Sequence, residues 1–157
     1  MKIEKVAVGV LLNNSYLVVS DKNNAVLIDP SSDFSTIDNM LIKSGATLKF
    51  IFLTHGHFDH IATAGEFAKK YGAKLVVSEK DAEMICDETK SLAYMFTSHF
   101  KPLSANILVK DGDELNLDEL SFTFIETPGH SKGSVCILCK DTIFSGDTVL
   151  ENSIGRT

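Results

Sequence analysis

A short stretch of the chain, residues 54–60, concentrates side chains that bind metal ions. It holds three of the five histidines of the 157-residue chain, together with one carboxylate. Imidazole and carboxylate groups suit zinc, iron and related metals. His55 and His57 can reach one ion together, while Asp59 and His60 leave the turn toward a neighbouring position. The competing interpretation, a polar turn with exposed histidines, is disfavoured because composition makes three histidines in six residues improbable.

Two later segments carry further ligand-type residues at strand ends. His130 follows a Pro-Gly turn after an apolar strand, and Asp147 follows Gly146 after another. Either turn alone is typical of an ordinary loop. Because binding sites in open α/β folds lie at the ends of strands, we expect both residues to join the histidine-rich segment.

The elements that must position these residues alternate between strands and helices, which predicts layered α/β architecture. Apolar runs and turn signals predict strands over residues 2–8, 15–20, 25–28, 50–53, 74–77, 107–109, 121–125, 134–139 and 142–144. Helical spacing predicts a helix capped by Ser31 or Ser32 and ended by Gly45, and a second over residues 61–71. A third helix is expected from the capping signal at Ser78 through Cys86, and residues 88–104 form an irregular excursion or lid.

Composition limits the classes of partner. The length predicts one domain over residues 1–157, and 44% hydrophobic residues indicate a soluble globular chain. A net charge of −6 argues against nucleic acid, and no apolar run approaches the roughly 20 residues of a membrane span. Three cysteines form no disulfide framework, so we expect a cytoplasmic protein. Cys136 and Cys139 would face opposite sides of a strand and are expected to be buried structural residues.

The histidine-rich segment, the TPGH turn and the GD turn, in this order, resemble the metallo-β-lactamase superfamily over essentially the whole chain. The resemblance implies an α/β fold class, a four-layer αββα sandwich with a dinuclear metal site at one edge. It implies that a first ion is held by His55, His57 and His130, a second by Asp59 and His60, and both by Asp147. Zinc is the implied cofactor, two ions in a complete site, with iron or manganese as alternatives.

Asp29 matches an aspartate that such proteins place near the metal-binding turn. We expect it to orient a ligand without binding metal. A plain strand-terminating turn with Pro30 is an equally supported interpretation.

The closing segment, residues 153–157, resembles the glyoxalase II-like branch of the family, and His60 argues against an antibiotic-degrading enzyme. This resemblance implies a hydrolase that acts on a small-molecule thioester such as an acyl-glutathione-like compound. Metal-bound hydroxide would attack, with Asp59 orienting the water and accepting a proton. The alternatives are a mononuclear iron persulfide dioxygenase using His55, His130 and Asp147, a lactonase, or an inactive metal-binding fragment.

Family members continue with further strands, a helix and another histidine, whereas no histidine follows His130 here. We therefore expect a domain incomplete at its C-terminus, its exposed edge covered by the missing segment or by a second copy. The spare histidine, His99, is expected to be exposed or substrate-facing. Aromatic and sulfur side chains in the excursion could line a substrate pocket, although core packing is favoured: Tyr94, Met95, Phe96 and Phe100.

Overall fold

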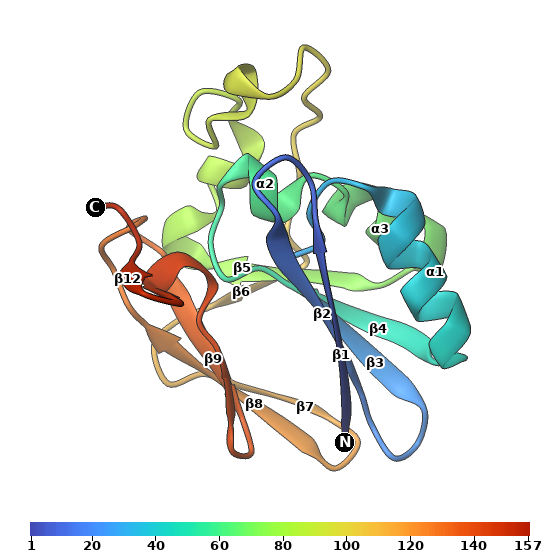
Figure 1. Ribbon diagram of the computed structural model, residues 1–157. Helices are drawn as coiled ribbons and strands as arrows, with labels where there is room; N and C mark the ends of the chain where they lie inside the picture. Colours follow the sequence, from blue (N-terminus) through green and yellow to red (C-terminus); the bar gives the residue numbers. More distant parts are fainter.

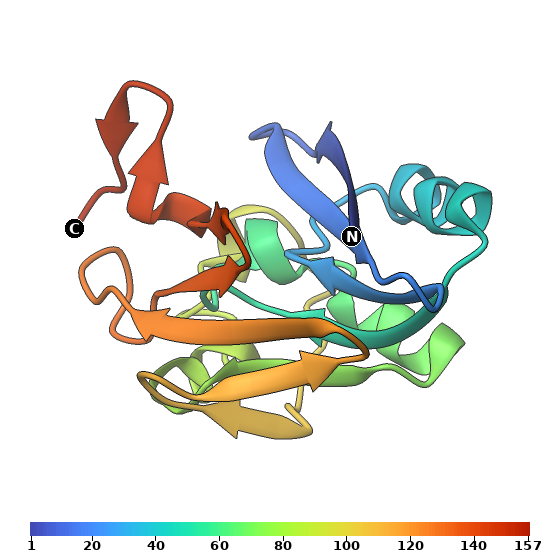
Figure 2. The same cartoon turned by 90° about the horizontal axis from the view of Figure 1, so that it is seen from below.

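The computed structural model describes residues 1–157 and stacks three layers. Helices cover one face of a six-stranded sheet, and a four-stranded sheet packs on its other face (Figures 1 and 2). This arrangement confirms the predicted fold class with three of the four layers of the αββα sandwich. No helix covers the outer face of the second sheet, where Ile125 and Ile143 are exposed.

The first sheet brings the ends of several strands to one edge. Its order along the sheet is β1 (Lys2–Val8), β2 (Asn13–Val19), β3 (Asn24–Ile28), β4 (Thr47–Phe52), β5 (Lys74–Ser78) and β6 (Ile107–Val109). The pairs from β3 to β6 are parallel, and parallel neighbours need crossover connections. Helices α1 (Phe34–Ser44) and α3 (Ala64–Tyr71) lie in the first two crossovers. The segments that follow β3, β4 and β5 therefore all begin at the same edge of the sheet, where the carboxyl ends of these strands lie.

The second sheet is antiparallel throughout. Its order is β10 (Thr142–Phe144), β9 (Val135–Cys139), β8 (Leu120–Glu126) and β7 (Glu114–Leu117). A small hairpin of β11 (Val149–Leu150) and β12 (Ser153–Ile154) follows and carries the C-terminal residues. Cys139 packs in the core between the sheets, and all three cysteines are free, as predicted.

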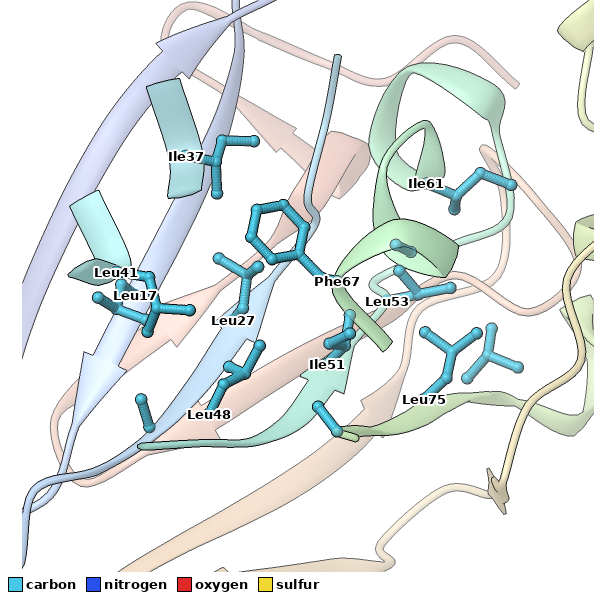
Figure 3. Packing of buried hydrophobic residues seen from close by; sticks show 14 of the residues in the cluster. Leu17, Leu27, Ile37, Leu41, Leu48, Ile51, Leu53, Ile61, Phe67 and Leu75 are labelled. Carbon is cyan, nitrogen blue, oxygen red and sulfur yellow. The ribbon is translucent and has the colours of Figure 1, made fainter. Parts of the chain in front are cut away.

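Burial on both faces of β4 explains its continuous apolar run. Side chains alternate along a strand, so Ile51 and Leu53 face the helices while Phe52 faces the second sheet. Figure 3 shows Ile51 and Leu53 packed with Phe67 of α3 on the helix side. On the other side Phe52 makes edge contacts with Phe122, with ring centroids 5.2 Å apart. This two-sided packing anchors the strand that ends directly before the histidine-rich turn.

Several predicted elements differ in detail. Helix α1 begins after Asp33, whose carboxylate accepts a hydrogen bond from the Thr36 amide, so Ser31 and Ser32 are not its cap. The helix predicted over 61–71 is two helices, α2 (Phe58–Ile61) and α3. The strand β7 and the hairpin β11–β12 were not predicted.

The prediction of a third helix from Ser78 through Cys86 is wrong. Two short 3-10 turns stand there, η1 (Glu79–Asp81) and η2 (Met84–Cys86), followed by a third, η3 (Ala93–Met95). The backbone hydrogen bonds there join residues three apart, from the Ala82 amide to the Glu79 carbonyl and from the Cys86 amide to the Glu83 carbonyl. This is the 3-10 pattern, which rarely extends beyond one turn. The structure contains no helix whose length and apolarity would let it cross a membrane.

Candidate metal centre

The six predicted ligands come from separate segments that meet at one edge of the fold. His55 and His57 follow β4, and Asp59 and His60 lie in the short helix α2 directly after them. His130 lies in the loop between β8 and β9. Asp147 lies in the 3-10 turn η4 (Gly146–Thr148) that follows β10.

Two groups of potential ligands share one histidine. The first group is His55, His57 and His130, and the second is His55, His60 and Asp147; within each group the ligand atoms lie within 4.8 Å of one another. Asp59 belongs to neither group, although its Oδ2 lies 3.7 Å from His60 Nε2. The tertiary structure thus brings the predicted residues together, and their roles as ligands stay predictions.

The donor atoms themselves suit a metal ion. His55 is 1% exposed, yet its Nε2 has no hydrogen-bond partner, whereas Nε2 of the buried His60 is in ion-pair contact with Asp147. A buried polar atom left unsatisfied costs about 1–3 kcal/mol, so such atoms are uncommon without a reason. Neutral imidazole nitrogens facing other ligands are the donors that zinc and iron accept. The residues present therefore fit a metal site.

Hydrogen bonds at the far side of two rings direct the other nitrogen of each ring toward the predicted ligands. His130 Nδ1 lies 2.8 Å from the Arg156 carbonyl, to which it donates, so its Nε2 faces His57 and Asp147. His60 Nδ1 lies 2.9 Å from Oδ2 of Asp29, and its Nε2 lies 3.1 Å from Asp147. This pattern is the usual one for histidine ligands, whose outer nitrogen bonds to a carbonyl or carboxylate.

Charge and burial shift the pKa values of the cluster in opposite directions. Burial lowers the pKa of His55 and of His57, and the neighbouring imidazoles lower both further. Burial would also lower the pKa of His60, but the charge of Asp29 and the nearby Asp147 outweigh it and raise that pKa to about 10. Contact with His60 in turn lowers the pKa of Asp147. A metal ion bound at His60 Nε2 would take the place of a proton on that nitrogen.

An open cleft of about 750 Å³ lies over the centre. The polar side chains that line it include His57, Asp59, His130, Asp147 and Arg156. Its apolar side chains, here called the apolar rim, are Leu11, Leu92, Met95, Phe96, Leu150 and Ile154. Met95 and Phe96 are 63% and 41% exposed, so core packing was the wrong interpretation for them. Of the four side chains considered, only Phe100 packs against the core cluster.

His99 lies apart from the centre. It is exposed and lines a second cavity, of about 530 Å³, with Phe58, Lys69 and Lys101. It belongs to neither group of potential ligands. Its exposure agrees with the sequence-based expectation.

Three supporting residues were not predicted. Thr54 donates to Asp29 from its amide and its hydroxyl, at 2.8 and 2.6 Å. Asn13, at the start of β2, donates its side-chain amide to Asp59. Asp81 is completely buried and accepts from the turn between His55 and His57. In the sequence Asp81 was assigned only to the capping signal of the predicted third helix, so its contact with the histidine-rich turn was missed.

Asp29 offers a direct test of how His60 is oriented. In Asp29→Asn an amide NH₂ would replace one of the two accepting oxygens. If that NH₂ faces His60, Nδ1 must accept a hydrogen bond from it, and the proton of the neutral ring then lies on Nε2. Nε2 is the nitrogen needed to bind metal. We expect zinc affinity to fall about 10- to 100-fold, as for other partners of metal ligands. Competition with a chromophoric chelator measures this.

Asp33→Asn is a matched control for that substitution. Asp33 also has a positive φ, 80° against 49° for Asp29, and also accepts from a threonine amide and hydroxyl. Asparagine caps helices as well as aspartate, so zinc affinity should be unchanged. Equal affinity in the two variants would contradict an orienting role for Asp29.

Comparison with known proteins agrees with this geometry. The metallo-beta-lactamase superfamily model matches residues 8–157. Hydroxyacylglutathione hydrolase 1 of Vibrio vulnificus is 35% identical over 93% of this chain and 51% of its own length. The probable metallo-hydrolase YqgX of Bacillus subtilis is 30% identical over 100% of this chain and 75% of its own. The chain thus spans about half of the first relative and three quarters of the second.

Solved structures share the fold. The B3 metallo-beta-lactamase BLEG-1 superposes with a TM-score of 0.89 at 28% identity, covering 99% of this chain and 77% of that one. A di-iron-bound structure of TTHA1623 gives 0.83 at 26% identity, covering 98% and 76%. This chain belongs to the metallo-beta-lactamase superfamily. Its relatives include hydroxyacylglutathione hydrolases, as the closing segment of the sequence predicted.

Proposed function

We propose that this chain carries the metal centre of a hydrolase that acts on a small-molecule thioester. The observation that carries the proposal is the unpartnered Nε2 of buried His55, placed within 4.8 Å of ligand atoms from both groups. The similarity to a hydroxyacylglutathione hydrolase supports a thioester as substrate. One ion would be held by His55, His57 and His130, the other by Asp59 and His60, with Asp147 shared; zinc is proposed, with iron or manganese as alternatives.

The metal ions, when bound, would polarise the scissile carbonyl and supply a nucleophile at neutral pH. The chain itself must hold the attacking water and receive its proton. Asp59 faces the cleft, and Asn13 occupies only its Oδ2, so the other oxygen is free to accept from water. Ser131, which directly follows His130, does not compete as a covalent nucleophile, because its hydroxyl is buried and donates to Asp81. Asp59 is therefore the proposed base.

The apolar rim suggests how the acyl group is bound. Phe96→Ala removes a large side chain from the rim of the cleft. Losing roughly 1–2 kcal/mol of apolar contact would raise KM about 5- to 30-fold for an apolar acyl thioester, with kcat little changed. Tyr94→Ala is the control, since Tyr94 is 59% exposed in the same turn but does not line the cleft. Equal KM values for both variants would exclude Phe96 from substrate binding.

Metal content and thioester hydrolysis, measured on one purified sample, test the proposed function. About two zinc or similar ions per chain, with turnover that a chelator abolishes and zinc restores, would support it. Metal binding without turnover of any thioester would contradict it and favour an inactive metal-binding fragment. Lactones assayed in parallel distinguish the related hydrolytic activity.

A second candidate function is that of a mononuclear iron persulfide dioxygenase, and one distance between potential ligands supports it. His130 Nε2 lies 3.5 Å from Asp147 Oδ2, and His55 belongs to the same group as Asp147. Two histidines and one carboxylate form the usual facial set for non-haem iron. One iron per chain and oxygen consumption with a persulfide, in place of thioester turnover, would support this candidate.

A further inference from the structure

One carboxylate outside the predicted ligand set joins the two turns that carry the histidines. Asp81 ends the 3-10 turn after β5 and is completely buried. Its Oδ2 accepts from the Gly56 amide at 3.0 Å and from the Ser131 hydroxyl at 2.6 Å. Its Oδ1 accepts from the Gly133 amide at 2.7 Å. Gly56 separates His55 from His57, and Ser131 directly follows His130.

These three donors are the stabilising partners of a buried charge. None of the ion pairs in the structure includes Asp81. A buried carboxylate is costly unless hydrogen bonds satisfy it, and bonds to a charged acceptor are about twice as strong as neutral ones. The donors belong to both turns. All three hydrogen bonds to Asp81 can therefore form only when the two turns keep their observed positions relative to each other.

The close approach of backbone to Asp81 leaves no room for side chains on the turns. A Cβ added at Gly133 would lie 2.6 Å from the Asp81 amide nitrogen and 2.7 Å from its Oδ1. A Cβ added at Gly56 would lie 2.8 Å from Met84, in the next 3-10 turn. The two glycines therefore allow both turns to reach the segment that carries Asp81.

We propose that Asp81 is a positioning residue for the metal centre, holding the turn of His55 and His57 in register with the loop of His130. It touches no predicted ligand side chain with its own carboxylate and acts through the backbone and Ser131. This inference rests on the proposed function only in taking the three histidines as metal ligands.

Asp81→Asn tests the proposal with Asp38→Asn as its control. Asparagine keeps the shape of Asp81 but replaces one accepting oxygen with a donor, which faces Gly133 or the Gly56–Ser131 pair. Asp38 is also a buried carboxylate, 8% exposed, and accepts from Lys70 and Tyr71 on the helix side of the fold. We expect zinc affinity to fall about 10- to 100-fold in Asp81→Asn and to stay at the wild-type level in Asp38→Asn.

A second measurement separates positioning from general loss of stability. In the metal-free protein the amide resonances of Gly56 and Gly133 should move in Asp81→Asn, and not in Asp38→Asn, even where both variants lower the Tm. Ser131→Ala removes a single donor, so it should fold and lose less zinc affinity than Asp81→Asn. It keeps the proposal testable if Asp81→Asn does not fold.

Zinc affinity is measured without substrate, so the two proposals can fail separately. Wild-type zinc affinity in folded Asp81→Asn, or a loss matched by Asp38→Asn, would overturn the positioning role alone. If Asp81→Asn does not fold, wild-type zinc affinity in Ser131→Ala would do the same. A wild-type chain that binds zinc and hydrolyses no thioester would overturn the proposed function, while a loss of affinity in Asp81→Asn would still support the positioning role.

Discussion

Replacing His55 with alanine is expected to remove metal binding and activity together. His55 is the one residue common to both groups of potential ligands, and its buried Nε2 has no other partner. Loss of a direct ligand should exceed the roughly 100-fold upper range seen when a partner of a ligand is lost. Zinc per chain, measured after dialysis, should therefore fall to background, and thioester hydrolysis should fall with it.

The stability of the His55→Ala variant provides an independent measurement. Removing the ring also removes an unsatisfied buried nitrogen worth about 1–3 kcal/mol, which offsets the cavity left behind. The metal-free variant should therefore stay folded. Zinc at 100 times its Kd stabilises a folded protein by about 2.7 kcal/mol, so the wild-type Tm should rise with zinc while the variant Tm should not.

His99→Ala is the control for this experiment. It removes an exposed histidine that lines the other cavity. Its zinc content, its activity and its zinc-dependent Tm should equal those of the wild type. A full complement of zinc in His55→Ala would show that His55 is not a ligand.

Asp59→Asn is expected to lower kcat by about 10²- to 10⁴-fold, the usual contribution of a general base. Asparagine fills the same space and can still accept from Asn13, so the local structure should persist. The group of His55, His57 and His130 does not include Asp59, so the ion held there should remain. Steady-state kinetics and metal analysis on one preparation check both expectations.

The same variant separates two roles that were assigned to Asp59. If Asp59 is chiefly a ligand of the second ion, zinc per chain falls with kcat, and excess zinc in the assay restores part of the activity. If Asp59 is chiefly the base, excess zinc restores none. Glu66→Gln, which neutralises a carboxylate in the neighbouring cavity, should behave as wild type. An unchanged kcat in Asp59→Asn would exclude both roles.

Much of the fold could be predicted because its signals are local. The apolar run of β4 and the turn residues that end it depend on neighbours a few positions away, and their two-sided burial is confirmed. The same holds for the ligand-type residues, since His55, His57 and His60 fall within six positions. Chemistry carried by side chains close in sequence is visible without knowledge of the fold.

The hydrogen bonds that orient these residues could not be predicted. Asp81 accepts from residues 25 and 52 positions away, and the Arg156 carbonyl accepts from His130 across 26. These partners depend on which strand ends meet at one edge of the sheet, and no local pattern encodes that. The lining of the cleft is another case, because Leu11, Phe96 and Leu150 come from three segments far apart in the sequence.

The sequence by itself therefore determined which groups are present for chemistry and which strands deliver them. The tertiary structure decided which nitrogen of each ring faces inward and which apolar side chains stay exposed around the cleft. The physical reason is that local propensity acts over a few residues, whereas orientation and exposure depend on contacts between distant segments. At this centre such contacts join the segments that follow β3 and β4, the turn after β5 and the loop before β9.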